Sequence, residues 1–287
     1  MIDPRELTPI QIKQAAGRLR GGQLMRFVDS TLLAPQATSD EINRLVDDAV
    51  KLRAHLCFNP AHMQRVLAKL ETFRGRMEKK SLVATVVGFP LGATTTKIKG
   101  AETEEVLALG ADEIDMVANH GLLKSGETDA YVADIDAVAE TISSFNKKSS
   151  AHRLLKVIIE CCFLNDGEKE FAAAAIKDVG RKRDIDVFVK TSTGFAQPPV
   201  GVPVGATISD VLLLRRVVGD YCSKENRVGV KAAGGIRDAT AAVRMLIAAG
   251  AFDYDLNLKY ETYHSVRLGT SNAAALARDF DDVYSGW

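Results

Sequence analysis

Two lysines and one aspartate lie in or at the ends of apolar runs, where a charged side chain is unfavourable unless it is paired or neutral. Lys190 and Lys231 each end a short apolar, β-branched run, and Asp115 lies within another. Either lysine alone could be a strand-end residue that reaches solvent. If the two runs are neighbouring strands, about 4.8 Å apart, both ammonium groups cannot stay charged at low cost. A neighbouring cation lowers the pKa of a lysine and frees its amine to attack a carbonyl group, with Asp115 as ion-pair partner or proton-transfer group.

Loops rich in glycine and hydroxyl residues follow the last two apolar runs of the chain. Their residues are Gly234, Gly235, Gly269, Thr270 and Ser271. Backbone N–H groups and hydroxyls in such loops can bind phosphate, and barrels often bind phosphate with the loops after strands seven and eight. The sequence therefore favours a phosphorylated carbonyl compound as substrate.

These residues need a scaffold, and short apolar runs recur eight times along the chain. The runs are Leu24–Val28, His55–Phe58, Leu82–Val87, Glu113–Val117, Leu154–Ile159, Val187–Val189, Val228–Val230 and Ser265–Leu268. Alternation with amphipathic segments predicts parallel strands joined by helical crossovers, and eight units in about 260 residues fit a closed α/β (β/α)8 TIM barrel. A doubly wound open sheet is the rival, but its first strand would run into a glycine-rich turn, and the segment 29–33 contains no glycine.

The helical segments have apolar residues three and four positions apart and recognisable ends. The predicted helices are Asp40–Leu52, Lys97–Leu109, Tyr131–Phe145, Glu168–Lys182, Ile208–Val218 and Arg237–Ala249. Thr38, Asp166 and Thr207 are the expected caps at helix starts, and Gly110 and Gly250 follow helix ends. An extra helix, 10–19, precedes the first strand and is placed to close the bottom of the barrel. We expect one domain, 1–287, with this helix in residues 1–22 and a C-terminal helix and tail in residues 272–287.

Composition narrows the function classes. The 287 residues hold 37 Lys+Arg and 37 Asp+Glu, so the formal net charge is zero and nucleic acid is not an expected partner. No apolar stretch reaches the roughly 18 residues of a membrane span, and the first 20 residues lack a signal-peptide pattern. The four cysteines are too few and too scattered for a disulfide scaffold, so we expect a reducing, cytoplasmic location.

Other site chemistries find less support in the sequence. The five histidines show no spacing typical of a metal site, and no metal or cofactor is expected. Cys57 ends the second run, but no histidine is placed to activate it, so we interpret it as a pocket-wall thiol. Glu160 follows the fifth run, and Lys156, four residues earlier on the same strand face, is its predicted partner.

Five motifs, in order along the chain, resemble those of the deoxyribose-phosphate aldolase family. They are GFPLG at 88–92, GADEIDMV at 110–117, LLKSG at 122–126, VKTSTGF at 189–195 and VKAAGGIR at 230–237. The resemblance runs from Asp29 to Ser271. It implies a class I aldolase that reversibly cleaves 2-deoxy-D-ribose 5-phosphate to acetaldehyde and D-glyceraldehyde 3-phosphate through a lysine Schiff base.

The resemblance also implies roles for individual residues. Lys190 would form the imine, Lys231 would lower its pKa, and Asp115 would move protons. Asp29 and Thr31 would hold this network or the substrate hydroxyls. The remaining residues implied in substrate and phosphate binding are Thr193, Gly194, Gly234, Gly235, Gly269, Thr270 and Ser271.

The chain departs from the family pattern in places, and alternatives stay open. Phe195 stands where some members have a lysine, the segment 196–203 is longer and richer in proline than expected, and Tyr284 is a candidate for a tail tyrosine that reaches the site. A different Schiff-base barrel enzyme, either a related aldolase or an acyl-transfer lyase, would share Lys190 and the phosphate loops. A non-catalytic sugar-phosphate-binding barrel would not need the buried lysines. The resemblance allows a homodimer, but no apolar stripe in the sequence predicts an interface.

Overall fold

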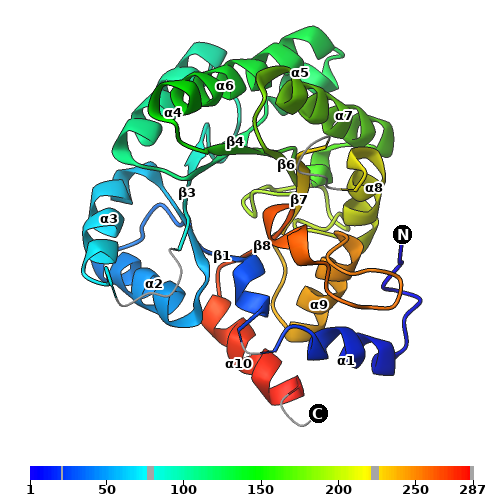
Figure 1. Cartoon of the computed structure of the whole chain (residues 1–287). Coiled ribbons are helices and arrows are strands. Elements are labelled where there is room, and N and C mark those ends of the chain that lie inside the picture. Colours follow the sequence, from blue (N-terminus) through cyan, green and yellow to red (C-terminus); the bar gives the residue numbers. More distant parts are fainter. Residues whose placement is uncertain (21, 76–80, 221–225, 285–287) are drawn as a thin grey trace.

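The chain forms a closed barrel of parallel strands ringed by helices (Figure 1). The computed structural model describes residues 1–287 except 21, 76–80, 221–225 and 285–287, and leaves out the side chains of 260 and 261. The strands are β1 Val28–Leu32, β2 His55–Phe58, β3 Val83–Val87, β4 Glu113–Val117, β5 Leu154–Ile158, β6 Val187–Lys190, β7 Val228–Ala233 and β8 Val266–Thr270. Each strand pairs in parallel with the next, and β8 pairs with β1. The predicted (β/α)8 barrel is confirmed.

Helices follow the strands on the outside of the barrel. They are α1 Pro9–Gly17, α2 Ser39–Leu52, α3 Met63–Glu71, α4 Thr96–Leu109, α5 His120–Lys124, α6 Thr128–Ser149, α7 Asp166–Arg183, α8 Ile208–Val218, α9 Ala239–Ala248 and α10 Ala273–Tyr284, with 3-10 turns η1 Leu24–Phe27, η2 Pro60–His62, η3 Cys161–Phe163 and η4 Tyr260–His264. The prediction for α8 is confirmed residue for residue, whereas α3 and α5 were not predicted. α3 buries Met63, Val66 and Leu70, which have ordinary helical spacing.

Two of the three predicted helix caps are confirmed. The side chains of Thr38 and Thr207 accept hydrogen bonds from the backbone at the starts of α2 and α8. The prediction of Asp166 as a cap is wrong, because Asn165 fills that position and accepts from Glu168 N. Asn165 and Glu168 are three residues apart and form a capping box, which satisfies two backbone donors at once.

The first strand was predicted one element too early. Residues 24–27 form η1, and β1 begins only at Val28. The apolar side chains of η1 are buried, so this run resembles a strand, while β1 itself carries the polar sequence DSTL. The cause is the position of β1, since alternate residues of this strand face a barrel interior that is charged rather than apolar.

The N-terminal segment differs from its prediction in position. The extra helix exists as α1, but it packs against α9 and α10 on the outside of the barrel (Figure 1). The segment that contacts β2 and β8 is η1, and Phe27 of η1 stacks on Tyr263 with ring centroids 4.4 Å apart. The end of the barrel at which the strands begin is therefore covered by η1 and η4 more than by α1.

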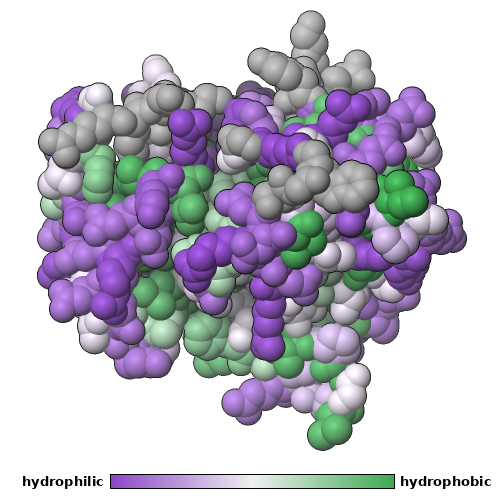
Figure 2. Space-filling model, turned by 90° about the horizontal axis from the view of Figure 1, so that it is seen from below, coloured by the Kyte–Doolittle hydropathy of each residue, from purple (hydrophilic) through white to green (hydrophobic). Residues whose placement is uncertain are grey.

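Hydrophobic packing and charge occupy different layers of this molecule. The main hydrophobic core lies between the strands and the helices, whereas the barrel interior holds a small apolar cluster of Leu33, Cys57, Ala84 and Val86 beside many buried charged residues. On the outer face drawn in Figure 2, hydrophilic side chains predominate and hydrophobic ones are scattered between them. Among the described residues, no helix is both long enough and apolar enough to cross a membrane.

Candidate active site

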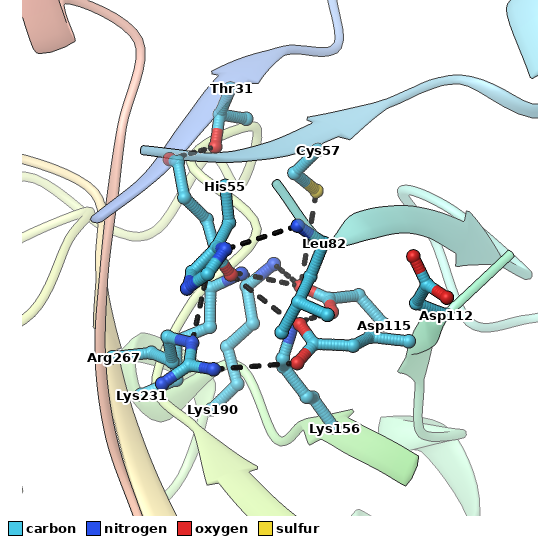
Figure 3. Close-up of polar contacts among 12 residues, drawn as sticks. Thr31, His55, Cys57, Leu82, Asp112, Asp115, Lys156, Lys190, Lys231 and Arg267 are labelled. Atoms are coloured by element: carbon cyan, nitrogen blue, oxygen red, sulfur yellow. Dashed lines mark hydrogen bonds and ion pairs between the residues drawn. The ribbon is translucent and has the colours of Figure 1, made fainter. Parts of the chain in front are cut away.

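The barrel brings Lys190, Lys231 and Asp115 together in its interior (Figure 3). Lys190 of β6 lies opposite Lys231 of β7 in the parallel register. Both Nζ atoms donate to Asp115 Oδ2 of β4, at 2.7 Å from Lys190 and 2.8 Å from Lys231. All three side chains are buried. These three side chains lie together, as the sequence predicts, although Lys231 lies inside β7 and not at its end.

A third lysine and two further carboxylates extend this network. Lys156 of β5 contacts Asp115 Oδ1 at 3.0 Å and Asp29 Oδ2 at 3.2 Å, and it also donates to Glu113 Oε2. Lys231 donates to Asp29 Oδ2 as well. The predicted pairing of Lys156 with Glu160 is therefore wrong. Lys156 points into the barrel toward the carboxylates, and the strand ends before Glu160.

Arg267 and His55 complete the inner layer. The Arg267 guanidinium on β8 lies 3.6 Å from Asp29 Oδ1 and 3.5 Å from Glu113 Oε1. His55 Nδ1 accepts from the backbone N–H of Leu82 at 3.2 Å (Figure 3). Burial and the charge of Arg267 lower the pKa of His55 to about 4, so this histidine is neutral at pH 7.

The balance of charges distinguishes Lys190 from its neighbours. The ion pairs of the barrel interior join three carboxylates, Asp29, Glu113 and Asp115, to four cations, Lys156, Lys190, Lys231 and Arg267. Four cations exceed three carboxylates, so one cation can lose its charge without leaving a carboxylate unmatched. Lys190 is that residue: burial and the neighbouring charge of Lys231 lower its pKa, against the opposing effect of Asp115.

The other groups of the network keep their charges. Although burial opposes it, Asp115 and Asp29 raise the pKa of Lys231 above its usual range. Burial would raise the pKa of Asp115, but Lys156, Lys190 and Lys231 hold it well below its ordinary value. At neutral pH Asp115 is therefore an ionised carboxylate that contacts both the charged Lys231 and Lys190, which loses its proton more easily.

A pocket of about 810 Å³ opens above this network. Lys190 lines it, as do predicted residues at the ends of β1 and β8 and in the loops after β6, β7 and β8, namely Thr31, Thr193, Gly194, Gly234, Gly235, Gly269, Thr270 and Ser271. Asp29 does not line the pocket, because it is fully buried beneath it and contacts the lysines. The geometry thus gives Asp29 the first of its two expected roles, holding the network.

Close backbone contacts fix the loops around the pocket. A Cβ on Gly205 would lie 2.4 Å from Gly234 O, and the N–H of Ala206 donates to the carbonyls of Ala233 and Gly234. Thr270 Oγ1 donates to Ile236 O at 3.1 Å, so this hydroxyl links the end of β8 to the loop after β7. Among the predicted hydroxyl residues of these loops, Ser271 remains exposed toward the pocket.

Comparison with known proteins now decides the family. A model of the DeoC/LacD family aldolases matches residues 34–260. The chain belongs to this family. The deoxyribose-phosphate aldolase of Streptococcus gordonii is 42% identical over 257 residues, which cover 89% of this chain and 96% of that one. The enzyme of the same name from Brevibacillus brevis is 38% identical over 266 residues, which cover 91% of this chain and 98% of that one.

A solved structure agrees with these sequence relatives. The deoxyribose phosphate aldolase from Aeropyrum pernix, described as a unique tetramer, matches with a TM-score of 0.71 and 26% identity over 96% of this chain and 100% of that one. The resemblance to the deoxyribose-phosphate aldolases is confirmed, and the protein is an aldolase and hence a lyase. The homodimer and the cytoplasmic location stay predictions.

Sequence reasoning missed part of the aldolase's site. Arg237 lines the pocket with an exposed side chain, but within its motif only Lys231 and the two glycines were assigned to the site. Lys156, Glu113 and Arg267 were not grouped with the site. For Glu113 the available signal was its position two residues before Asp115, on the same face of one strand. For Lys156 and Arg267 it was a charged residue inside an otherwise apolar strand.

Three further expectations have mixed outcomes. Phe195 lines the aldolase pocket and meets Phe89 edge-on, with ring centroids 5.2 Å apart. Tyr284 is buried on α10, where its hydroxyl lies 3.1 Å from Thr240 Oγ1, so it does not reach the pocket in this structure. The prediction of Cys57 as a pocket-wall thiol is wrong: it is fully buried and does not line the pocket, its Sγ lies 4.0 Å from Asp115 Oδ2, and burial raises the pKa of its thiol. Cys222 lies outside the described residues.

No group of three His, Cys, Asp or Glu side chains that could hold a metal ion occurs in the described part of the chain. The carboxylates of the barrel interior are instead matched by lysine and arginine side chains.

Proposed function

We propose that this aldolase reversibly cleaves 2-deoxy-D-ribose 5-phosphate to acetaldehyde and D-glyceraldehyde 3-phosphate through an imine on Lys190. The observation that carries the proposal is the excess cation: Lys190 lines the pocket, has a lowered pKa and is the interior cation whose charge the carboxylates do not require. The names of the relatives at 42% and 38% identity support this substrate.

The first half of the proposed reaction builds the imine. The neutral amine of Lys190 attacks C1 of the open-chain aldehyde and forms a carbinolamine. Asp115, assisted by a water molecule, carries protons to the departing hydroxyl, which leaves as water. The position of Asp115 supports this role, because its Oδ2 already lies 2.7 Å from Lys190 Nζ. The product is an iminium ion that joins Lys190 to C1.

The second half breaks the carbon–carbon bond. A base removes the proton of the C3 hydroxyl, the C2–C3 bond breaks, and its electron pair moves into the iminium to give an enamine. D-glyceraldehyde 3-phosphate leaves. A proton is then added at C2, and water hydrolyses the resulting iminium to acetaldehyde and the free amine of Lys190.

The phosphate end of the substrate would be bound by the loops after β7 and β8. Gly234 and Gly235 have positive φ angles of 84° and 78°, a conformation that glycine adopts without strain. Ser271 lines the same end of the pocket, and the exposed side chain of Arg237 adds a positive charge there. Binding energy from this remote group would orient the reacting carbons.

Reductive trapping tests the proposal. The protein is incubated with acetaldehyde and borohydride, and the adduct is located by intact mass and peptide mapping. We expect a two-carbon adduct on the peptide that contains Lys190. An adduct on Lys231 would exchange the roles of the two lysines. No adduct, with a control imine reduced under the same conditions, would overturn the Schiff-base proposal. A panel of donor and acceptor aldehydes would then separate deoxyribose 5-phosphate from other phosphorylated carbonyl substrates.

A further inference from the structure

One wall of the pocket is a long loop that follows Lys190 directly. Thr193, Gly194 and Phe195 line the pocket at the start of this loop, and residues 203–206 line it at the end. We define the pocket wall as residues 193–206. Contacts at the two ends of this wall must hold its position relative to the loops after β7 and β8, because most of the wall between its ends is exposed.

The far end of the wall is held by backbone contacts. The N–H of Ala206 donates to Ala233 O at 3.0 Å and to Gly234 O at 3.1 Å. A Cβ on Gly234 would lie 3.0 Å from Gly205 Cα, so the wall rests directly on the loop after β7. A change in the angle of the wall would therefore be transmitted to the loop proposed to bind phosphate.

The near end of the wall is held by Glu160. Its Oε2 accepts from Thr193 N at 3.1 Å and also from Thr193 Oγ1. Oε1 lies 3.3 Å from the same N–H. The Thr193 hydroxyl in turn accepts from Phe195 N at 3.0 Å. One carboxylate thus holds Thr193 directly and Phe195 through the Thr193 hydroxyl.

Glu160 occupies this place at a structural cost. It is 1% exposed, and its backbone has φ 50° and ψ 69°, which a residue with a side chain adopts reluctantly. In the described part of the chain no lysine or arginine lies close enough to its carboxylate to form a salt bridge. Burial raises its pKa, and the hydrogen bonds from Thr193 and the more distant charge of Lys190 offset this only in part. A costly conformation and an unpaired buried carboxylate together indicate a role beyond packing.

The chemistry of Thr193 explains why an acceptor is needed. Its hydroxyl oxygen already accepts from Phe195, so the hydroxyl proton must go to an acceptor, and its backbone N–H needs one as well. A carboxylate satisfies both donors. An amide oxygen in the place of Oε2 can still accept from both donors, but the N–H2 group then replaces Oε1, which accepts from Thr193 N at 3.3 Å and from Cys162 Sγ at 3.8 Å.

We propose that Glu160 is a positioning residue that anchors the pocket wall through Thr193 and so sets the affinity for the phosphorylated substrate. This inference rests on the proposed function of the pocket. Glu160 does not touch the reacting carbons in this proposal. Its loss should therefore weaken substrate binding and leave the amine chemistry of Lys190 intact.

The test compares Glu160→Leu and Glu160→Gln with Asp186→Asn. Asp186 is a buried carboxylate at the opposite end of β6, paired with His152, and serves as the matched control. For Glu160→Leu we expect KM for deoxyribose 5-phosphate to rise about tenfold or more, because small displacements of binding groups have effects of this size. The rate of acetaldehyde trapping on Lys190 should stay within about twofold of the parent protein. The KM of Glu160→Gln should lie between those of the parent protein and Glu160→Leu, and Asp186→Asn should leave KM unchanged.

The outcomes separate this inference from the proposed function. If the parent protein neither cleaves the sugar phosphate nor traps acetaldehyde, the proposed function fails. If the parent is active and Glu160→Leu lowers kcat and trapping while KM is unchanged, Glu160 acts on Lys190 and the anchor proposal is wrong. If Glu160→Leu does not fold, Glu160→Gln and Thr193→Val carry the test: the anchor requires that both raise KM and that the double variant be no worse than Thr193→Val alone. Additive effects would overturn it.

Discussion

At the scale of single residues, Lys190 differs from the other interior cations because no carboxylate depends on it alone. Asp115 also receives Lys231 and Lys156, so neutral Lys190 leaves its partner satisfied. Lys190→Arg should reduce turnover to below about one-thousandth and abolish acetaldehyde trapping, since a guanidinium stays protonated and forms no imine. Both are measured by coupled assay and intact mass. Lys182→Arg, an exposed pair partner of Asp136, is the control and should be unaffected. Near-normal activity of Lys190→Arg would remove Lys190 from its role.

The second residue-scale prediction concerns Lys231. Removing it leaves Lys156, Lys190 and Arg267 to match three carboxylates, so the barrel interior then favours a protonated Lys190. Lys231→Leu should raise the pKa of Lys190, and the rising limb of the trapping rate against pH should move to higher pH. Lys99→Met, which alters a buried lysine paired with Asp134 outside the barrel, should not move this limb. An unchanged profile for Lys231→Leu would contradict the charge balance.

At the scale of elements, the sequence was informative where an element is apolar on the side that faces a helix. The strands from β2 to β8 were found because their helix-facing residues join the main core. β1 was misplaced because the buried apolar run of η1 precedes it, and periodicity cannot separate a short strand from a short helical turn.

The partners inside the barrel could be predicted only in part. The placement of Lys190 and Lys231 at the ends of consecutive runs correctly predicted that they are neighbours, whereas alternation along one strand paired Lys156 with Glu160, four residues apart. That pairing failed because Glu160 leaves the strand in a left-handed conformation and turns to Thr193. Register between strands decides which charges meet across the barrel, and Asp115 meets Lys156 as its direct neighbour on β5. A single sequence does not contain this register.

An element-scale prediction tests the loops after β7 and β8. Ser271 lies just before α10 and lines the end of the pocket that is proposed to bind phosphate. Ser271→Glu places a negative charge there, so KM for deoxyribose 5-phosphate should rise by about tenfold or more, while KM for unphosphorylated deoxyribose should change less than about threefold. Ser271→Ala is the matched control for the loss of the hydroxyl. Equal effects of Ser271→Glu on both substrates would move the phosphate site elsewhere.

At the scale of the whole molecule, a charged barrel interior ties stability to pH. Lysine charges hold the pKa of Asp115 well below its ordinary range, so the stability that this carboxylate contributes is complete above about pH 4 and is lost as the pH falls below it. Two half-buried histidines act earlier in the titration. Burial lowers the pKa of His55 and of His120 from 6.5 to about 4. The unfolded chain therefore binds more protons than the folded one between these values, and stability should fall as the pH drops from 6.5 to 4.

The two histidines can be separated by substitution. Neither ring nitrogen of His120 has a hydrogen-bond partner among the described residues, and its ring lies 6.1 Å from that of Phe163. His120→Phe should therefore keep the packing while removing one titrating group. Urea unfolding between pH 4 and 8 measures the effect. The slope of the free energy of unfolding between pH 4 and 6.5 should decrease, by up to about 1.4 kcal/mol per pH unit, with little change above pH 7. If the slope stays the same, His120 binds protons equally in both states, and its burial does not contribute to the acid sensitivity of the barrel.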